Sequence, residues 1–231
     1  MSFEHELIEQ RREKLRRIEA LGYTGYPHRF DATHTVGRIA AEYSAQSGVE
    51  LAESKPPVRV CGRLTALRGH GKAGFADITQ AGSRLQIYVR KDALGDRGFA
   101  LYRLLDLGDW AGVEGHLFRT RTGELSVHVT GLTLLAKALL PMPEKWHGLQ
   151  DIEARYRQRY LDLLANPEVS QAFRTRSTLV RALRSAMDRR GFIEVETPML
   201  QSIAGGAAAR PFRTHHNALD MNLYLRIAPE L

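Results

Sequence analysis

The chain opens on a stretch in which apolar residues recur at helical spacing among charged ones. This spacing predicts an amphipathic helix over residues 3–21, which Gly22 ends. A second, shorter helix is predicted over Val36–Gln46. The charged face of the first helix either faces solvent or contacts RNA, and both remain open. The apolar positions of the first helix are Phe3, Leu7, Ile8, Leu15, Ile18 and Leu21.

Between residues 56 and 140 the period changes, and apolar and polar residues alternate as in half-buried strands. A short helix is predicted over Gly98–Leu107, and residues 81–83 (AGS) predict a hairpin turn. Five strands with a helix between the third and the fourth is the order of an OB-fold, a small barrel that often binds oligonucleotides. Another small barrel or an open sheet is the alternative. The alternating stretches are Val58–Leu67, Gly74–Thr79, Leu85–Arg90, Trp110–Arg119 and Leu125–Leu132.

The last third returns to a helical period. Helices are predicted over Asp151–Leu164 and Ser170–Arg190, and the alternation of Phe192–Thr197 (FIEVET) predicts a strand that Pro198 stops. The apolar side of the long helix carries Phe173, Leu179, Val180, Leu183 and Met187. The predicted organisation is a helical extension (1–55), an OB-fold domain (56–140), a proline-containing linker (141–150) and a C-terminal α/β region (151–231).

Charge adds a class of partner. The chain of 231 residues has a formal net charge of +7, and its pI is about 9.7. A basic balance favours polyanions, because lysine and arginine replace counterions on phosphates. Between Ile152 and Arg190 nine residues are arginine and four are acidic. Arginine in this excess favours bidentate contacts with phosphate or carboxylate groups.

Composition also excludes several classes of protein. The single cysteine, Cys61, excludes an internal disulfide framework and a thiolate zinc cluster, and its alternating strand predicts a buried thiol. No apolar run approaches the ~20 residues of a membrane span. The charged N-terminus lacks the apolar stretch of a signal peptide. We therefore expect a cytoplasmic protein with no membrane partner.

The predicted barrel offers candidates for RNA contact. Phe75 follows the basic loop 68–72 (RGHGK), and a ring beside cations is what single-stranded bases need. Gln86 can donate to and accept from a base edge, and Glu124 can accept from a base amino group. Each side chain also has an ordinary explanation, since a strand phenylalanine is often core and a strand glutamine often faces solvent.

The C-terminal region holds weaker candidates. The glycine–alanine segment Gly205–Arg210 lets the backbone approach a ligand closely, and Glu230 follows a proline at what would be the start of a helix. His215 and His216 are adjacent, so on a strand they point to opposite faces and do not chelate together; we expect no metal there. No catalytic triad, P-loop or dinucleotide fingerprint is present.

The amino-acid sequences of several segments are specific enough to indicate a family. GFIEVETPML, GGAAARPF, THHNALD and RIAPEL follow one another in the last third, after KAGFADI and LQIYV in the barrel. On these segments the chain resembles the class II lysyl-tRNA synthetases of the bacterial type from end to end. The resemblance implies an α+β protein, in which a five-stranded OB-fold barrel precedes the first part of an antiparallel class II catalytic domain.

The resemblance also implies roles for residues. Phe75 would stack on anticodon bases, and Arg68, Gln86 and Glu124 would help read them. The backbone at Gly206 and the carboxylate of Glu230 would hold the α-ammonium group of lysine. Residues 173–200 would form the first class II motif, at a homodimer interface. The partners would be lysine and lysine tRNA, and the reaction would be lysine–tRNA ligation through lysyl-adenylate.

ATP and Mg²⁺ are the cofactors that the resemblance implies. The second and third class II motifs, with the ATP-binding arginines and the Mg²⁺ carboxylates, are not found in these 231 residues. We therefore expect no catalytic and no metal-binding residue in this chain, and a truncated, catalytically incomplete enzyme. Two alternatives are a stand-alone OB-fold module that binds tRNA and a fragment whose only activity is to form dimers.

Overall fold

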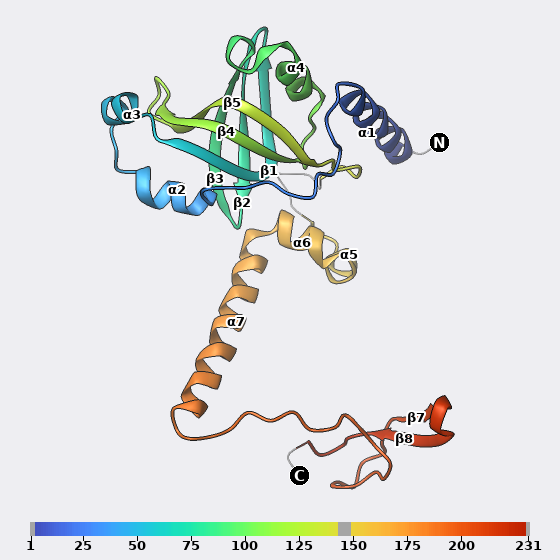
Figure 1. Ribbon diagram of the computed structural model, residues 1–231. Coiled ribbons are helices and arrows are strands. Elements are labelled where there is room, and N and C mark those ends of the chain that lie inside the picture. The colour runs from blue at the N-terminus through green and yellow to red at the C-terminus, as the bar shows by residue number, and fades with distance from the viewer. Residues whose placement is uncertain (1–2, 143–148, 230–231) are drawn as a thin grey trace. The chain divides into compact units, whose positions relative to one another are not determined.

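The computed structural model describes residues 3–142 and 149–229. They fall into two compact units, Met1–Pro167 and Glu168–Leu231, each of which is described by itself. A closed five-stranded barrel forms the centre of the first unit (Figure 1). Most of the predicted linker, residues 143–148, and the predicted lysine-binding residue Glu230 lie outside the described residues.

The barrel confirms the predicted OB-fold. Its strands lie in the order β1-β2-β3-β5-β4, with β1 and β4 pairing antiparallel to close it and β3 and β5 pairing parallel. Helix α4 (Lys91–Leu104) lies between the third and fourth strands, as predicted, although it begins earlier than residue 98. The strands are β1 (Pro57–His70), β2 (Ala73–Gln80), β3 (Ser83–Arg90), β4 (Trp110–Arg119) and β5 (Leu125–Ala136).

The barrel core follows from the period-two pattern, because alternate side chains of a strand point to the same side. Fully buried aliphatic residues come from all five strands, and burial of each such side chain contributes about 1.5–3 kcal/mol. Cys61 is half-buried, so the predicted buried thiol is corrected. The fully buried strand residues include Val60, Leu64, Ile78, Ile87, Val89, Val113, Leu117, Val127, Val129 and Leu134.

Three helices precede the barrel: α1 (Phe3–Ala20), α2 (Val36–Tyr43) and α3 (Gly48–Ser54). The first two were predicted, and their apolar residues Ile18 and Ile39 are buried in the same core as the strands. Helix α3 was missed, although a capping box marks its start in the sequence. Ser47 accepts from the backbone of Glu50, and the Glu50 carboxylate accepts from the backbone of Ser47.

Two basic residues of α1 connect this helix to other parts of the first unit. The Arg11 guanidinium donates to the carbonyl oxygens of Ala138 and Leu140. Lys14 Nζ lies 2.5 Å from Asp106 Oδ1, and Lys137 binds the other oxygen of that carboxylate. Part of the charged face of α1 therefore holds this helix in the first unit rather than facing solvent or contacting RNA.

After the undescribed residues, the first unit ends in two short helices, α5 (Ile152–Arg157) and α6 (Arg159–Ala165). The prediction of a single helix over 151–164 was wrong, because Gln158 has φ −112° and ψ 57° and interrupts the helical path. The buried carboxylate of Asp162 accepts hydrogen bonds from Arg155, Arg159 and Asn166, which joins the two helices.

The second unit has a long helix and a small sheet. Helix α7 (Pro167–Asp188), whose first residue ends the first unit, corresponds to the predicted long helix. The sheet has the order β6-β8-β7, formed by Leu200–Gln201, Met221–Leu225 and Arg213–His216. A 3-10 turn, Asn217–Leu219, connects β7 to β8.

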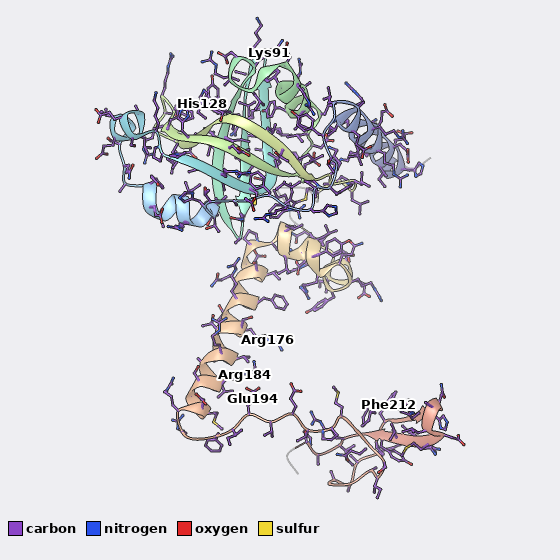
Figure 2. All side chains as sticks on the ribbon, in the orientation of Figure 1. Lys91, His128, Arg176, Arg184, Glu194 and Phe212 are labelled. Carbon is purple, nitrogen blue, oxygen red and sulfur yellow. The ribbon has the colours of Figure 1, made fainter. Side chains whose placement is uncertain are left out.

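The predicted strand over Phe192–Thr197 was wrong for the described structure. This segment forms no ladder there, and its apolar side chains are exposed, with Ile193 at 85%. Alternation predicts a strand only where another strand pairs with it, and β8 pairs instead with β6 and β7. Glu194 forms an ion pair with Arg184 of α7 at 3.0 Å (Figure 2).

Candidate nucleic-acid interface

The outward face of the barrel gathers polar and aromatic side chains from adjacent strands. Strand register places Phe75 of β2 opposite Tyr88 of β3, and Tyr88 opposite His128 of β5. Two residues along the same strands, Gln86 lies opposite Ser126. Because residues two apart share a face, these side chains form two neighbouring rows.

A cavity of about 540 Å³ opens on this face. Three of the four residues predicted to bind an anticodon line it, so the fold brings together Arg68, Phe75 and Gln86. The Phe75 and Tyr88 rings stack with centroids 4.6 Å apart and planes 28° apart. Loop residues between β4 and β5 close the opposite side. The complete lining is Arg68, Phe75, Gln86, Tyr88, Phe118, Arg119, Thr120, Arg121 and Thr122.

The polar side chains of the cavity are held by neighbours. Arg68 forms an ion pair with Asp77 at 3.0 Å, and the Asp77 side chain is only 6% exposed. Ser126 Oγ donates to Gln86 Oε1 at 2.9 Å. That bond engages the amide oxygen, so the Nε2 group is the part of Gln86 that can donate to a base carbonyl.

Glu124 lies at the edge of this arrangement, outside the residues that line the cavity. Its carboxylate pairs with Arg84 at 2.6 Å, and Arg84 also pairs with Asp77 at 3.1 Å. Asp77 and Glu124 are thus connected through one guanidinium. The structure brings Glu124 close to the predicted group by this connection rather than by a shared cavity wall.

The backbone under Phe75 is fixed from the far side. Tyr102 of α4 donates a hydrogen bond from its hydroxyl to the Phe75 carbonyl oxygen at 3.2 Å. Gly74 permits this approach, because a Cβ there would lie 2.8 Å from the Tyr102 ring carbon Cε1. Burial raises the pKa of the Tyr102 hydroxyl, so it stays protonated and able to donate.

Several residues of this face escaped the sequence analysis. Tyr88, Phe118 and His128 have rings within 6.0 Å of one another, and the His116 ring stacks on His128 at 5.0 Å. Tyr88 follows Gln86 by two residues and so shares its face, which the sequence signals. The contribution of β4 and β5 depends on register, which the sequence does not reveal.

The predicted lysine site is not assembled in the described residues. Gly206 has φ +98°, a conformation that favours glycine, and lies in the irregular segment between β6 and β7. Its predicted partner Glu230 is outside the described residues. His215 Nε2 lies 3.4 Å from Asp220, but among the described residues no three metal-ligating side chains gather. None of the described helices is both long and apolar enough to cross a membrane.

Two family models match the two regions of the chain. Residues 58–135 match the OB-fold nucleic acid binding domain, which covers the barrel and the cavity. Residues 151–231 match the class II tRNA synthetases for D, K and N. The described barrel and these two matches confirm both parts of the predicted fold, an OB-fold followed by the start of a class II aminoacyl-tRNA synthetase catalytic region.

Curated relatives narrow the class. The chain is 53% identical to the lysine–tRNA ligase of Moorella thermoacetica over 228 aligned residues. The aligned region covers 99% of this chain and 45% of that protein. It is 50% identical to the lysine–tRNA ligase of Shouchella clausii and 52% identical to that of Bacillus cereus, over 98% and 96% of this chain. Over nearly its whole length the chain is therefore similar in sequence to lysine–tRNA ligases. It spans less than half the length of these relatives.

Proposed function

We propose that the barrel binds the anticodon loop of lysine tRNA and thereby serves lysine–tRNA ligation in the cytoplasm. The observation that carries this proposal is the cavity in which Phe75, Gln86 and Arg68 converge. A ring for stacking, an amide for a base edge and a guanidinium for phosphate are the three components that single-stranded RNA requires.

The amide orientation supports a base carbonyl as the partner of Gln86. Since Ser126 engages Gln86 Oε1, the Nε2 group donates, and a uracil carbonyl is an acceptor of matching chemistry. Glu124, adjacent to the cavity through Arg84, is the acceptor in this site. We assign Phe75 to stacking, Gln86 and Glu124 to base edges, and Arg68 to the backbone.

The experiment is binding of a labelled anticodon stem–loop of lysine tRNA to the chain. Phe75→Ala is expected to weaken binding by about 1–3 kcal/mol through lost stacking. Phe212→Ala, an exposed phenylalanine of the second unit (Figure 2), is the matched control and should leave affinity unchanged. Equal affinities of the wild type and Phe75→Ala would remove Phe75 from the site.

Lysine activation is a property that we propose only for a complete enzyme of this family. The family implies ATP and Mg²⁺, but the described residues contain no ligand cluster that fits a metal ion, so no chemical step is assigned to them. Gly206 and Glu230 stay proposed lysine-binding residues. Lysine-dependent ATP–pyrophosphate exchange by these 231 residues is expected at background, and clear exchange would contradict this expectation.

We further propose that residues 173–200 join two copies of the chain. Within the second unit Val180, Leu183 and Met187 of α7 are 39%, 62% and 41% exposed, and a second copy would cover them. Leu183→Glu is expected to lower the dimer fraction in sedimentation at micromolar concentration, whereas Arg103→Glu on α4 should not. A clean monomer for the wild type would reject the dimer.

A stand-alone tRNA-binding module is the second candidate. It is supported by the fact that the residues of the cavity all belong to the barrel. The coding sequence distinguishes the two candidates. A stand-alone module would have a stop codon after Leu231, whereas the coding sequence of a ligase would continue with an arginine-bearing second motif.

A further inference from the structure

A second cavity adjoins the first on the barrel. It has a volume of about 680 Å³, and Tyr88 is the residue that it shares with the first cavity. Its remaining walls come from the β1–β2 turn, the end of β3 and the first turns of α4. They are Lys72, Ala73, Arg90, Lys91, Asp92, Gly95 and Asp96.

We propose that this second cavity binds a backbone phosphate of the same single-stranded RNA, one nucleotide beyond the bases in the first cavity. Lys72 is the principal cation, and the Tyr88 ring separates the two positions. This inference rests on the proposed function, because the first cavity must hold a base for the second to receive the adjoining phosphate.

Charge supports an anionic ligand. Arg90 pairs with Asp92, and Lys91 pairs with Asp96 at 2.6 Å. Among the residues that the structure describes, Lys72 forms no ion pair, so the lining carries one uncompensated positive charge. Phosphodiester oxygens neutralise such a charge and release its counterions.

The two ion pairs do not block the cavity. Their side chains are between 44% and 85% exposed, and pairs in this range add little to stability. The Arg90 guanidinium has five N–H donors, so it can bind Asp92 and a phosphate oxygen together. Lys91, which Figure 2 labels at the α4 end of the barrel, can likewise turn one of its three donors to the ligand.

The backbone holds these cations in place. Lys91 N donates to the Lys72 carbonyl oxygen at 2.9 Å, which joins the β1–β2 turn to the start of α4. Ala73 lies opposite Arg90 in the β2–β3 ladder. The backbone positions of Lys72 and Arg90 are therefore fixed relative to each other and to Tyr88, whose ring is stacked on Phe75.

The experiment compares oligouridylates of three to eight nucleotides on the wild-type chain, Lys72→Ala and Arg103→Ala. Arg103 is the matched control, an exposed cation at the other end of α4. Lys72→Ala should bind the shortest oligomers as the wild type does and bind the longer ones about 5–10-fold more weakly near 0.1 M salt. Its slope of log K against log salt should be shallower by about 0.7–1.

A neutral methylphosphonate placed at each linkage in turn identifies the phosphate. One linkage should weaken binding to the wild type but not weaken binding to Lys72→Ala any further. If Lys72→Ala weakens all lengths equally, or if every linkage adds to its effect, Lys72 acts through the general field and the proposed site is wrong.

Failure of the proposed function has a different signature. In that case the wild type binds no oligouridylate and Phe75→Ala changes nothing. Binding of inorganic phosphate to the wild type as tightly as the longer oligomers would instead replace the RNA by a free anion. Unchanged thermal unfolding of Lys72→Ala, expected for an exposed turn residue, separates these results from misfolding.

Discussion

Arg84 Nη2 lies 2.6 Å from Glu124 Oε1, and this ion pair joins β3 to the loop that precedes β5. The other terminal nitrogen of Arg84 binds Asp77, whose carboxylate also binds Arg68. A cation of the outer face thus positions two acidic groups, and one oxygen of Glu124 is already engaged before any base arrives.

Arg84→Met is therefore expected to weaken anticodon stem–loop binding through Glu124. In a double-mutant cycle with Glu124→Ala, the two effects should be non-additive by about 0.5–3 kcal/mol, because they remove the same arrangement. Fluorescence anisotropy of the labelled RNA measures all four affinities. Additive losses would mean that Arg84 contacts RNA independently of Glu124.

The buried ion pair of Lys137 gives a prediction on stability. Lys137 Nζ lies 2.7 Å from Asp109 Oδ2, and both side chains are fully buried. Lys137→Met leaves the Asp109 charge buried without its partner, so we expect a loss of about 3–5 kcal/mol in the free energy of unfolding. Urea denaturation measures it.

Arg103→Met is the matched control for Lys137→Met, since Arg103 is exposed and should change stability by less than about 0.5 kcal/mol. The neighbouring Asp106 reports the same network. Burial alone would raise the pKa of Asp106, but hydrogen bonds from Lys137 and Lys14 outweigh it and hold that pKa below its usual value. Similar unfolding curves for the two variants would contradict a stabilising role.

The barrel was predictable because each strand buries one face, so apolar and polar residues alternate along its sequence. The strand over Phe192–Thr197 was not, because pairing depends on a partner that alternation does not name. The site divides in the same way. Phe75 and Gln86 were found from residue type and position. His128 could not be found in this way, because the β3–β5 register places it beside Tyr88. The role of Arg84 could not be found either, because it depends on a contact with Glu124, 40 residues away in the sequence.

His116 predicts a pH dependence of stability. Burial, the neighbouring His128 and Lys55 lower the pKa of His116 from its ordinary 6.5. The unfolded chain then binds the proton more readily, so the contribution of His116 is present above pH 6.5 and is lost as pH falls through the lowered pKa. Urea denaturation at pH 5.5, 6.5 and 7.5 should show this loss.

Carboxylates also titrate in acid, so the variant His116→Gln supplies the comparison. Its stability should fall less than that of the wild type between pH 7.5 and 5.5, because the neutral amide takes up no proton. Parallel curves for the two proteins would exclude His116 as a source of the pH dependence.

Gly115 on β4 allows the close approach of β5 at an irregularity between Glu114 and Gly115. A Cβ there would lie 2.9 Å from the His128 carbonyl carbon and closer still to its oxygen, and backbone cannot rotate away as a side chain can.

Gly115→Ala is expected to cost about 1–3 kcal/mol of stability through overpacking. It should also weaken RNA binding by displacing His128, whose ring lies 5.8 Å from that of Tyr88 in the cavity wall. Gly69→Ala on β1 is the control, since a Cβ there meets nothing within 4 Å and should leave stability equal or slightly higher. Urea denaturation of both variants, with anisotropy on the folded protein, tests the pair, and equal unfolding midpoints would show that β5 yields without cost.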